Sequence, residues 1–86
     1  MVYTLNFSNT WERNFKKLDN DAKERANEAL LKIMETPYAG KGLTGNLKGM
    51  WSFRIGKHRI LYEINDISNE VFILAVGLRK NIYDFL

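Results

Sequence analysis

Three arginines and one tyrosine in the second half of the chain are the side chains best suited to phosphate chemistry: Arg54, Arg59, Arg79 and Tyr83. The segment FRIGKHRILYE, residues 53–63, predicts two strands joined by a turn at Gly56-Lys57, because glycine adopts positive φ at little cost. That register places Arg54 directly opposite Arg59. Facing guanidinium groups repel each other, so we expect an anion such as phosphate to bind between them. The alternative is that both side chains turn into solvent or reach a carboxylate.

The chemistry that such a site could perform is cleavage of RNA. The apolar run EVFILAVGL, residues 70–78, predicts a strand that delivers Arg79 close to the facing pair. Three guanidinium groups could bind a phosphodiester through paired hydrogen bonds and stabilise the charge that develops during attack by the 2′-hydroxyl. Tyr83 could stack on a base, bind a phosphate or donate a proton, and the alternative is that it fills the core.

The group that moves the proton stays open, because arginine keeps its proton at any ordinary pH. His58 could serve as a base, but its place beside the turn favours a partly buried structural role. Glu63 could also serve if it lay within hydrogen-bond reach of the hydroxyl. We expect no metal ion and no other cofactor, because the sequence holds no cluster of histidine and acidic residues.

The distribution of charge points to nucleic acid as the ligand. The formal net charge is +3, and the whole excess lies in residues 37–86. Residues 39–62 contain no acidic side chain, so this surface should attract phosphates. The alternative is an ordinary surface of mixed charge. Lys41, Lys48 and Lys57 lie in this stretch, and Lys80 directly follows Arg79; these four lysines are expected to bind RNA.

Length and composition indicate one domain spanning residues 1–86. A hydrophobic fraction of 45% excludes a disordered chain, and no apolar run is long enough for a membrane helix. The absence of cysteine excludes disulfides and thiolate metal sites, and the N-terminal residues do not resemble a signal peptide, which favours the cytoplasm.

The order of the expected elements predicts an α+β fold. Residues 2–7 alternate like a strand, and Ser8 can cap a helix whose stripe holds Trp11, Phe15 and Leu18 and which ends near Asp19-Asn20. A second helix follows at once and stops before Pro37. Its start has the spacing of a capping box at Asp21 and Glu24, and five residues form its apolar stripe: Ala22, Ala26, Ala29, Leu30 and Ile33.

After this helical hairpin we expect an ordered, glycine-containing loop at residues 38–49 that leads into the sheet and lacks the context of a nucleotide-binding loop. Three antiparallel strands then complete a twisted sheet. The helices should pack on the sheet face formed by Trp51, Phe53, Ile60 and Tyr62. Arg54 and Arg59 would then point to the open face.

The whole chain resembles the RelE/ParE superfamily of bacterial and archaeal toxins, especially its RelE branch. Three stretches carry the resemblance: FKKLDNDAKERANEALLKI, LTGNLKGMWSFRIGKHRILYEI and VFILAVGLRKNIYDF. Within them, the ordered motifs W-x-x-R-x-G, H-R-I-x-Y and V-G-x-R-K-x-x-Y are the most specific.

This resemblance implies a RelE-like fold and the toxin of a type II toxin–antitoxin pair, a metal-independent endoribonuclease that cuts mRNA in the ribosomal A site. It implies that Arg54 transfers a proton or stabilises charge, Arg59 binds the phosphate, and Arg79 stabilises the transition state. Tyr83 would orient the nucleotide. The four lysines would bind RNA or the ribosome. A RelB-like antitoxin would cover the basic face or displace the C-terminal segment that carries Tyr83.

One position departs from the family pattern, because Ser52 stands where the family often has lysine or arginine. Either Lys48, Lys57 or Lys80 supplies the missing charge, or cleavage is slower. Two other functions stay open: a ParE-like protein that inhibits DNA gyrase without cutting RNA, and a non-catalytic binding module.

Overall fold

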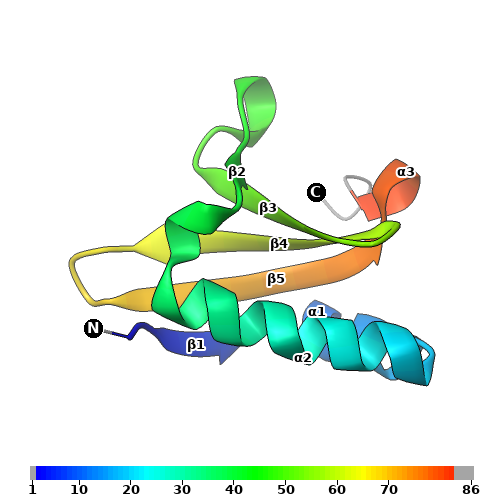
Figure 1. The fold of residues 1–86 in the computed structure, drawn as a ribbon. Helices are drawn as coiled ribbons and strands as arrows, with labels where there is room; N and C mark the ends of the chain where they lie inside the picture. The colour runs from blue at the N-terminus through cyan, green and yellow to red at the C-terminus, as the bar shows by residue number, and fades with distance from the viewer. Residues whose placement is uncertain (1, 83–86) are drawn as a thin grey trace.

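The structure, a computed structural model, describes residues 2–82 as a five-stranded sheet with two main helices packed on one face (Figure 1). The predicted α+β fold is therefore confirmed. The strand order is β1-β5-β4-β3-β2, with β1 parallel to β5 and the other neighbours antiparallel. The elements in chain order are β1 Thr4–Phe7, α1 Asn9–Lys16, α2 Asn20–Glu35, η1 Pro37–Ala39, β2 Lys41–Gly42, η2 Gly45–Leu47, β3 Met50–Ile55, β4 His58–Asn65, β5 Glu70–Leu78 and α3 Arg79–Ile82.

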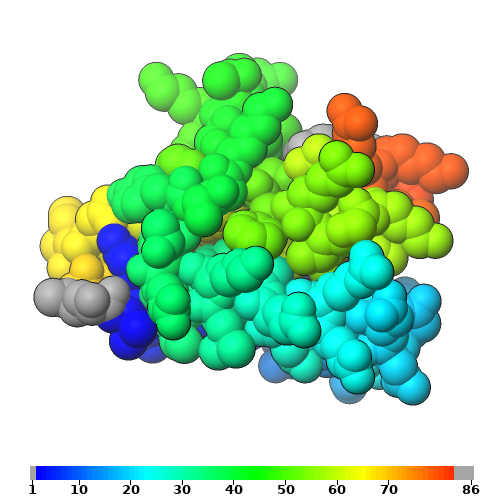
Figure 2. Space-filling view, viewed as in Figure 1, coloured from blue at the N-terminus to red at the C-terminus, as the bar shows by residue number. Residues whose placement is uncertain are grey.

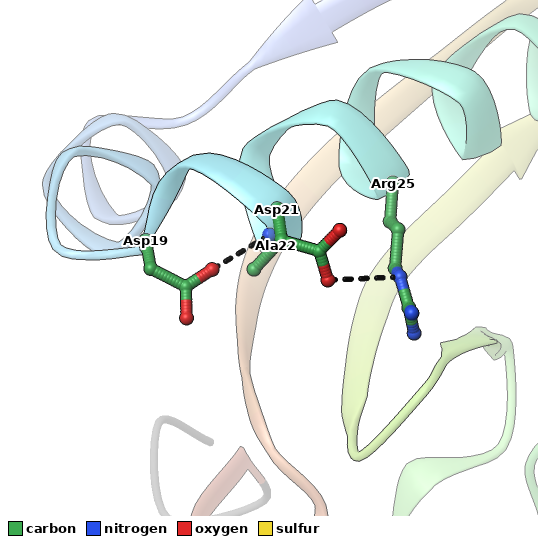
Figure 3. Close-up of polar contacts among 4 residues, drawn as sticks. All are labelled: Asp19, Asp21, Ala22 and Arg25. Carbon is green, nitrogen blue, oxygen red and sulfur yellow. Dashed lines mark hydrogen bonds and ion pairs between the residues drawn. The ribbon is translucent and has the colours of Figure 1, made fainter.

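Each main helix begins at a side chain that caps its free backbone N–H groups. Ser8 caps α1 as predicted, since its Oγ accepts a hydrogen bond from Trp11 N at 3.0 Å. The predicted capping box at the start of α2 is wrong: Asp19 is the cap, and it accepts from Ala22 N at 2.8 Å (Figure 3). Helix α1 ends at Lys16, earlier than the predicted end near Asp19-Asn20. Asp19 has the extended backbone of a cap, so the chain must leave the helical conformation before it.

Asp21 takes a different role inside α2, where it pairs with Arg25 one turn later (Figure 3). The distance from Arg25 Nε to the Asp21 carboxylate is 3.2 Å, and both side chains are more than half exposed. An exposed pair of this kind contributes little to stability.

The main core lies between the helices and the predicted face of the sheet. Ala26, Ala29 and Ile33 of α2 pack against Ile60 and Tyr62, with Trp51 and Phe53 partly buried at the margin. Trp11 of α1 is buried in the same cluster, and Phe15 and Leu18 pack against it. The predicted face assignment is confirmed, and Arg54 and Arg59 are consequently left to the opposite face.

The segment at residues 38–49 is ordered, as predicted, but it is not only a loop. It contains the short strand β2, which adds a fifth strand beside β3. Buried Tyr62 fixes the entry to this strand, because its hydroxyl donates to the Pro37 carbonyl at 2.6 Å. A Cβ placed on Gly40 would come within 2.2 Å of the Tyr62 hydroxyl and 2.8 Å of the Ser52 carbonyl oxygen, so only glycine fits there.

Gly40→Ala is therefore expected to lower the free energy of unfolding by about 1–3 kcal/mol, the usual range for overpacking. The reason is that the Ser52 carbonyl belongs to the backbone of β3 and cannot move aside as a flexible side chain would. Urea denaturation measures the change. Gly49→Ala cannot serve as the control, because Gly49 has a φ of 99° and a side chain there would strain the backbone. The control is Ala39→Gly, which changes the neighbouring position without adding a side chain.

An exposed cluster ties the N-terminal segment, η1 and the β4–β5 turn together. Both Tyr3 and Tyr38 donate a hydrogen bond to the Asp66 carboxylate, Tyr3 at 2.7 Å. Tyr38 also packs edge-on against Trp51, with ring centroids 5.1 Å apart. The two hydroxyl groups hold the pKa of Asp66 below its usual value, and the hydrogen bond to Asp66 raises the pKa of Tyr38 to about 12.

These shifts predict a pH window for stability. The Asp66 contribution is present above the usual carboxyl pKa of 3.8 and is lost as the pH falls through the lower, folded pKa. The Tyr38 contribution is present below the usual phenol pKa of 10.0 and is lost as the pH rises towards 12. We expect Asp66→Asn to flatten both limbs of a plot of melting temperature against pH. Unchanged limbs in that variant would show that the cluster does not set the window.

Among the described residues, no helix is both long enough and apolar enough to cross a membrane.

Candidate active site and nucleic-acid interface

The β3–β4 hairpin forms the centre of the candidate site. Its register pairs Arg54 with Arg59, as predicted. Gly56 has a φ of 64°, which the tight turn requires. The turn also lies against α2, because a Cβ on Gly56 would be 2.8 Å from Arg25 Nη1. In the space-filling view this hairpin, coloured yellow-green, lies between α2 in cyan and α3 in orange (Figure 2).

The two facing arginines make hydrogen bonds that draw them in opposite directions along β3. Arg59 reaches back to Ser52 and donates from Nη1 to its Oγ at 3.2 Å. Arg54 turns toward the hairpin turn and donates from Nε to the Gly56 carbonyl at 3.0 Å. The two side chains therefore diverge, and this reduces their repulsion in the free protein. Among the described residues, neither arginine pairs with a carboxylate, which was the alternative left open by the sequence.

Arg59 is the more enclosed of the two. Its side chain is partly buried, and Nε is a buried donor without a hydrogen-bond partner among the described residues. A buried donor left unpaired is costly, so an acceptor that reaches this atom would bind favourably.

The first pocket beside the pair, of about 220 Å³, brings the three arginines together. It is lined by Arg54, Gly56, Lys57, His58, Arg59 and Arg79. Arg79 reaches it because α3 turns directly out of β5 and lies beside the hairpin turn, where Arg79 N donates to the Lys57 carbonyl at 3.3 Å (Figure 1). Ile82 anchors α3, since it is buried with Leu61 and Ala75 on the open face of the sheet.

The second pocket, of about 340 Å³, lies on the other side of the pair and shares Arg54 and Arg59 with the first. Its remaining lining residues are Ala39, Gly40, Lys41, Ser52 and Phe53. Neither pocket has a carboxylate among its described lining residues. Uncompensated guanidinium and ammonium groups around two hollows form a surface suited to a polyanion.

Of the four predicted lysines, Lys57 lines the first pocket and Lys41 the second. Lys57 and Lys80 border a wider hollow at the end of β5, together with Leu78 and Arg79. Lys48 is exposed in the β2–β3 connection and is not among the described residues that line either pocket. Tyr83 lies outside the described residues.

His58 and Glu63 differ in their relation to the arginines. His58 is partly buried as expected, and it also lines the first pocket. It pairs with buried Ile55 in the ladder, and it lines a further hollow beside the start of α2. Glu63 is exposed on the open face opposite Met50 in the ladder and does not line either pocket.

Sequence reasoning missed the hydrogen-bond role of Ser52. Only 2% of Ser52 is exposed, and its hydroxyl holds Arg59. The available signal was the spacing, because Ser52 lies two residues before Arg54 on the same face of β3 and is thus a diagonal neighbour of Arg59. The described residues contain no group of three or more histidine, cysteine or acidic side chains placed to hold a metal ion.

Comparison with known proteins identifies the family of the chain. Residues 5–86 match the family model described as the ParE-like toxin of type II bacterial toxin–antitoxin systems. The chain is 36% identical over 85 residues to the toxin RelG of Mycobacterium tuberculosis, covering 96% of this chain and 98% of that one.

Solved structures share the fold. A chain of the RelBE2 toxin–antitoxin complex of Mycobacterium tuberculosis superposes with a TM-score of 0.84 at 33% identity, over 92% of this chain and 100% of that chain. A chain of the archaeal RelE–RelB complex from Pyrococcus horikoshii gives 0.75 at 20% identity, over 92% and 97% of the two chains, and shows the common fold alone. The chain therefore belongs to the RelE/ParE family of toxins from type II toxin–antitoxin systems.

Proposed function

We propose that this toxin inhibits translation as an endoribonuclease that cuts mRNA in the A site of the ribosome. The observation that carries the proposal is the first pocket, where three arginines meet without a carboxylate among the described lining residues. Inhibition of a protein target such as gyrase does not require a pocket that binds phosphate on several sides.

The reaction would be attack of a ribose 2′-hydroxyl on the adjacent phosphorus. The bond from phosphorus to the 5′-oxygen breaks, which leaves a 2′,3′-cyclic phosphate on one fragment and a 5′-hydroxyl on the other. Arg59 would bind the phosphate, helped by its unpaired Nε, and Arg79 would stabilise the charge of the transition state. Arg54 would assist in charge stabilisation or proton transfer, and Tyr83 would orient the nucleotide.

Proton transfer in this mechanism requires a group that both loses and gains a proton near neutral pH. His58 is a candidate because it lines the same pocket as the three arginines. The ribosome would contribute by holding the mRNA in position. Lys48, Lys57 and Lys80 would then contact RNA from the rim of the basic surface.

The partner that controls the activity would be a RelB-like antitoxin. The matched complexes from Mycobacterium tuberculosis and Pyrococcus horikoshii each pair a toxin with its antitoxin. In this chain an antitoxin would neutralise the surface around the arginines, since an acidic segment fits the same charges as RNA. A cytoplasmic location follows from the proposed substrate.

Two parallel assays on the purified protein test this proposal. The protein is expected to stop cell-free translation of a reporter and to fragment its mRNA, while DNA supercoiling by gyrase continues. A single 2′-deoxy substitution at the cut position should protect the mRNA there. Intact mRNA together with inhibited supercoiling would move the assignment to the ParE-like function, and no effect in either assay would favour the binding module.

A further inference from the structure

The second pocket contains a cation, Lys41, for which the sequence predicts RNA binding in general but no particular phosphate. In the antiparallel ladder, Lys41 of β2 lies directly opposite Ser52 of β3. Directly paired residues point to the same face of a sheet, so the Lys41 side chain extends from the neighbouring strand over the position that Ser52 occupies. Lys41 and Ser52 both line the pocket, together with Arg54 and Arg59.

Ser52 cannot supply the charge of this pocket itself. It is neutral and almost fully buried, and its hydroxyl accepts the hydrogen bond from Arg59. A basic side chain at this position would repel Arg59 instead of holding it. The serine thus positions one arginine, and the ammonium group of Lys41 is left as the third cation that lines the pocket.

Contacts on both sides of Lys41 hold its backbone in position. Tyr62 holds the Pro37 carbonyl, and Gly40 fits closely against Tyr62 and the backbone of Ser52. On the far side of Lys41, Leu43 N donates to the Met50 carbonyl at 2.9 Å. The backbone at Lys41 therefore does not have to be ordered when the ligand binds, and this lowers the entropy cost of binding.

We propose that the second pocket binds the phosphodiester next to the one that is cleaved, on the same RNA strand, and that Lys41 is its phosphate-binding residue. The two pockets lie on either side of Arg54 and Arg59, so a strand crossing the hairpin places successive phosphates in them. This inference rests on the proposed nuclease function.

The test combines a change in the protein with a change in one RNA phosphate. Ribosomes are programmed with synthetic mRNAs that carry a neutral methylphosphonate either on the 5′ side or on the 3′ side of the cut position, and single-turnover cleavage is measured below saturation. Lys41→Ala is expected to cleave unmodified mRNA about 10–100 times more slowly, the usual effect of losing a hydrogen bond to a charged group. Lys41→Arg should recover most of the rate, because it keeps the charge.

The decisive result is that the effects of Lys41→Ala and of the neutral linkage on the cleavage rate do not add. One of the two neutral linkages should slow the wild type about as much as Lys41→Ala does, and it should leave Lys41→Ala unaffected. Lys16→Ala, which removes an exposed lysine of α1, is the control with the same change in charge. A thermal melt of each variant checks that it is folded.

Three results would contradict the inference. If Lys41→Ala cleaves like Lys16→Ala, Lys41 does not bind the substrate. If Lys41→Ala is slow but remains as sensitive as the wild type to both neutral linkages, Lys41 acts away from the neighbouring phosphates. If the wild type leaves all mRNAs intact, the nuclease function itself fails, and this outcome is distinct from the first two because they require an active wild type.

Discussion

Arg79→Ala is expected to slow cleavage of ribosome-bound mRNA by about 10²–10³-fold, the effect of removing one preorganised group that stabilises transition-state charge. Arg79 lines the first pocket, and its exposed side chain makes no described contact on which folding depends. Removing one of three neighbouring positive charges should leave stability unchanged or slightly improved. Activity and stability should therefore change independently or in opposite directions.

Arg79→Lys is the matched variant for this position. It keeps the charge but loses the planar pair of donors, so its rate should fall between those of the wild type and Arg79→Ala. Single-turnover cleavage on programmed ribosomes and urea denaturation of each variant give the two quantities. A folded Arg79→Ala protein that cleaves at the wild-type rate would remove Arg79 from the site.

Ile60→Ala is expected to lower the free energy of unfolding by about 2–5 kcal/mol. Ile60 is fully buried in the core between α2 and the sheet, next to the arginine that faces the other way, so truncation leaves a cavity. Small domains have a total stability of about 5–15 kcal/mol, and this loss is a large share of it. Urea denaturation measures the difference directly.

The same substitution at an exposed position provides the control. Ile67 is 99% exposed in the β4–β5 turn, and Ile67→Ala should change the free energy of unfolding by about 0.5 kcal/mol or less. If Ile60→Ala were no more destabilising than Ile67→Ala, the assignment of the core face of the sheet would be wrong.

Much of the site could be predicted from the sequence because local rules determine it. A two-residue turn with glycine at a positive φ fixes the register of the hairpin, and the register makes Arg54 and Arg59 neighbours. The alternation of side chains then separates this pair from the core residues Ile60 and Tyr62. The position of Arg79 followed from the end of an apolar strand.

The second pocket could not be predicted in this way, because contacts between distant segments create it. Strand β2 is two residues long and contains a glycine, so it has no periodic pattern to mark it. Its place beside β3 depends on the fit of Gly40 against Tyr62, which lies 22 positions later in the chain. The cap at Asp19 was missed for a different reason: three acidic side chains near the start of α2 could each accept a hydrogen bond, and only the backbone conformation distinguishes them.

Hydrogen bonds within the hairpin keep the two facing arginines, Arg54 and Arg59, apart. Ser52 and the Gly56 carbonyl hold the two guanidinium groups apart in the free protein, so the pair does not depend on a bound anion to fold. Each arginine still has N–H donors without a partner among residues 2–82, and both arginines line the two pockets. The arrangement allows the toxin to be folded before it meets its substrate.

The most direct test of the central claim is a toeprint of mRNA on translating ribosomes after the purified protein is added. The account predicts that reverse transcription stops at a new 5′-hydroxyl end within the codon in the A site, and that this stop is absent with Arg79→Ala. An mRNA that remains intact while translation or gyrase is inhibited would contradict the claim that the arginine pocket cuts RNA.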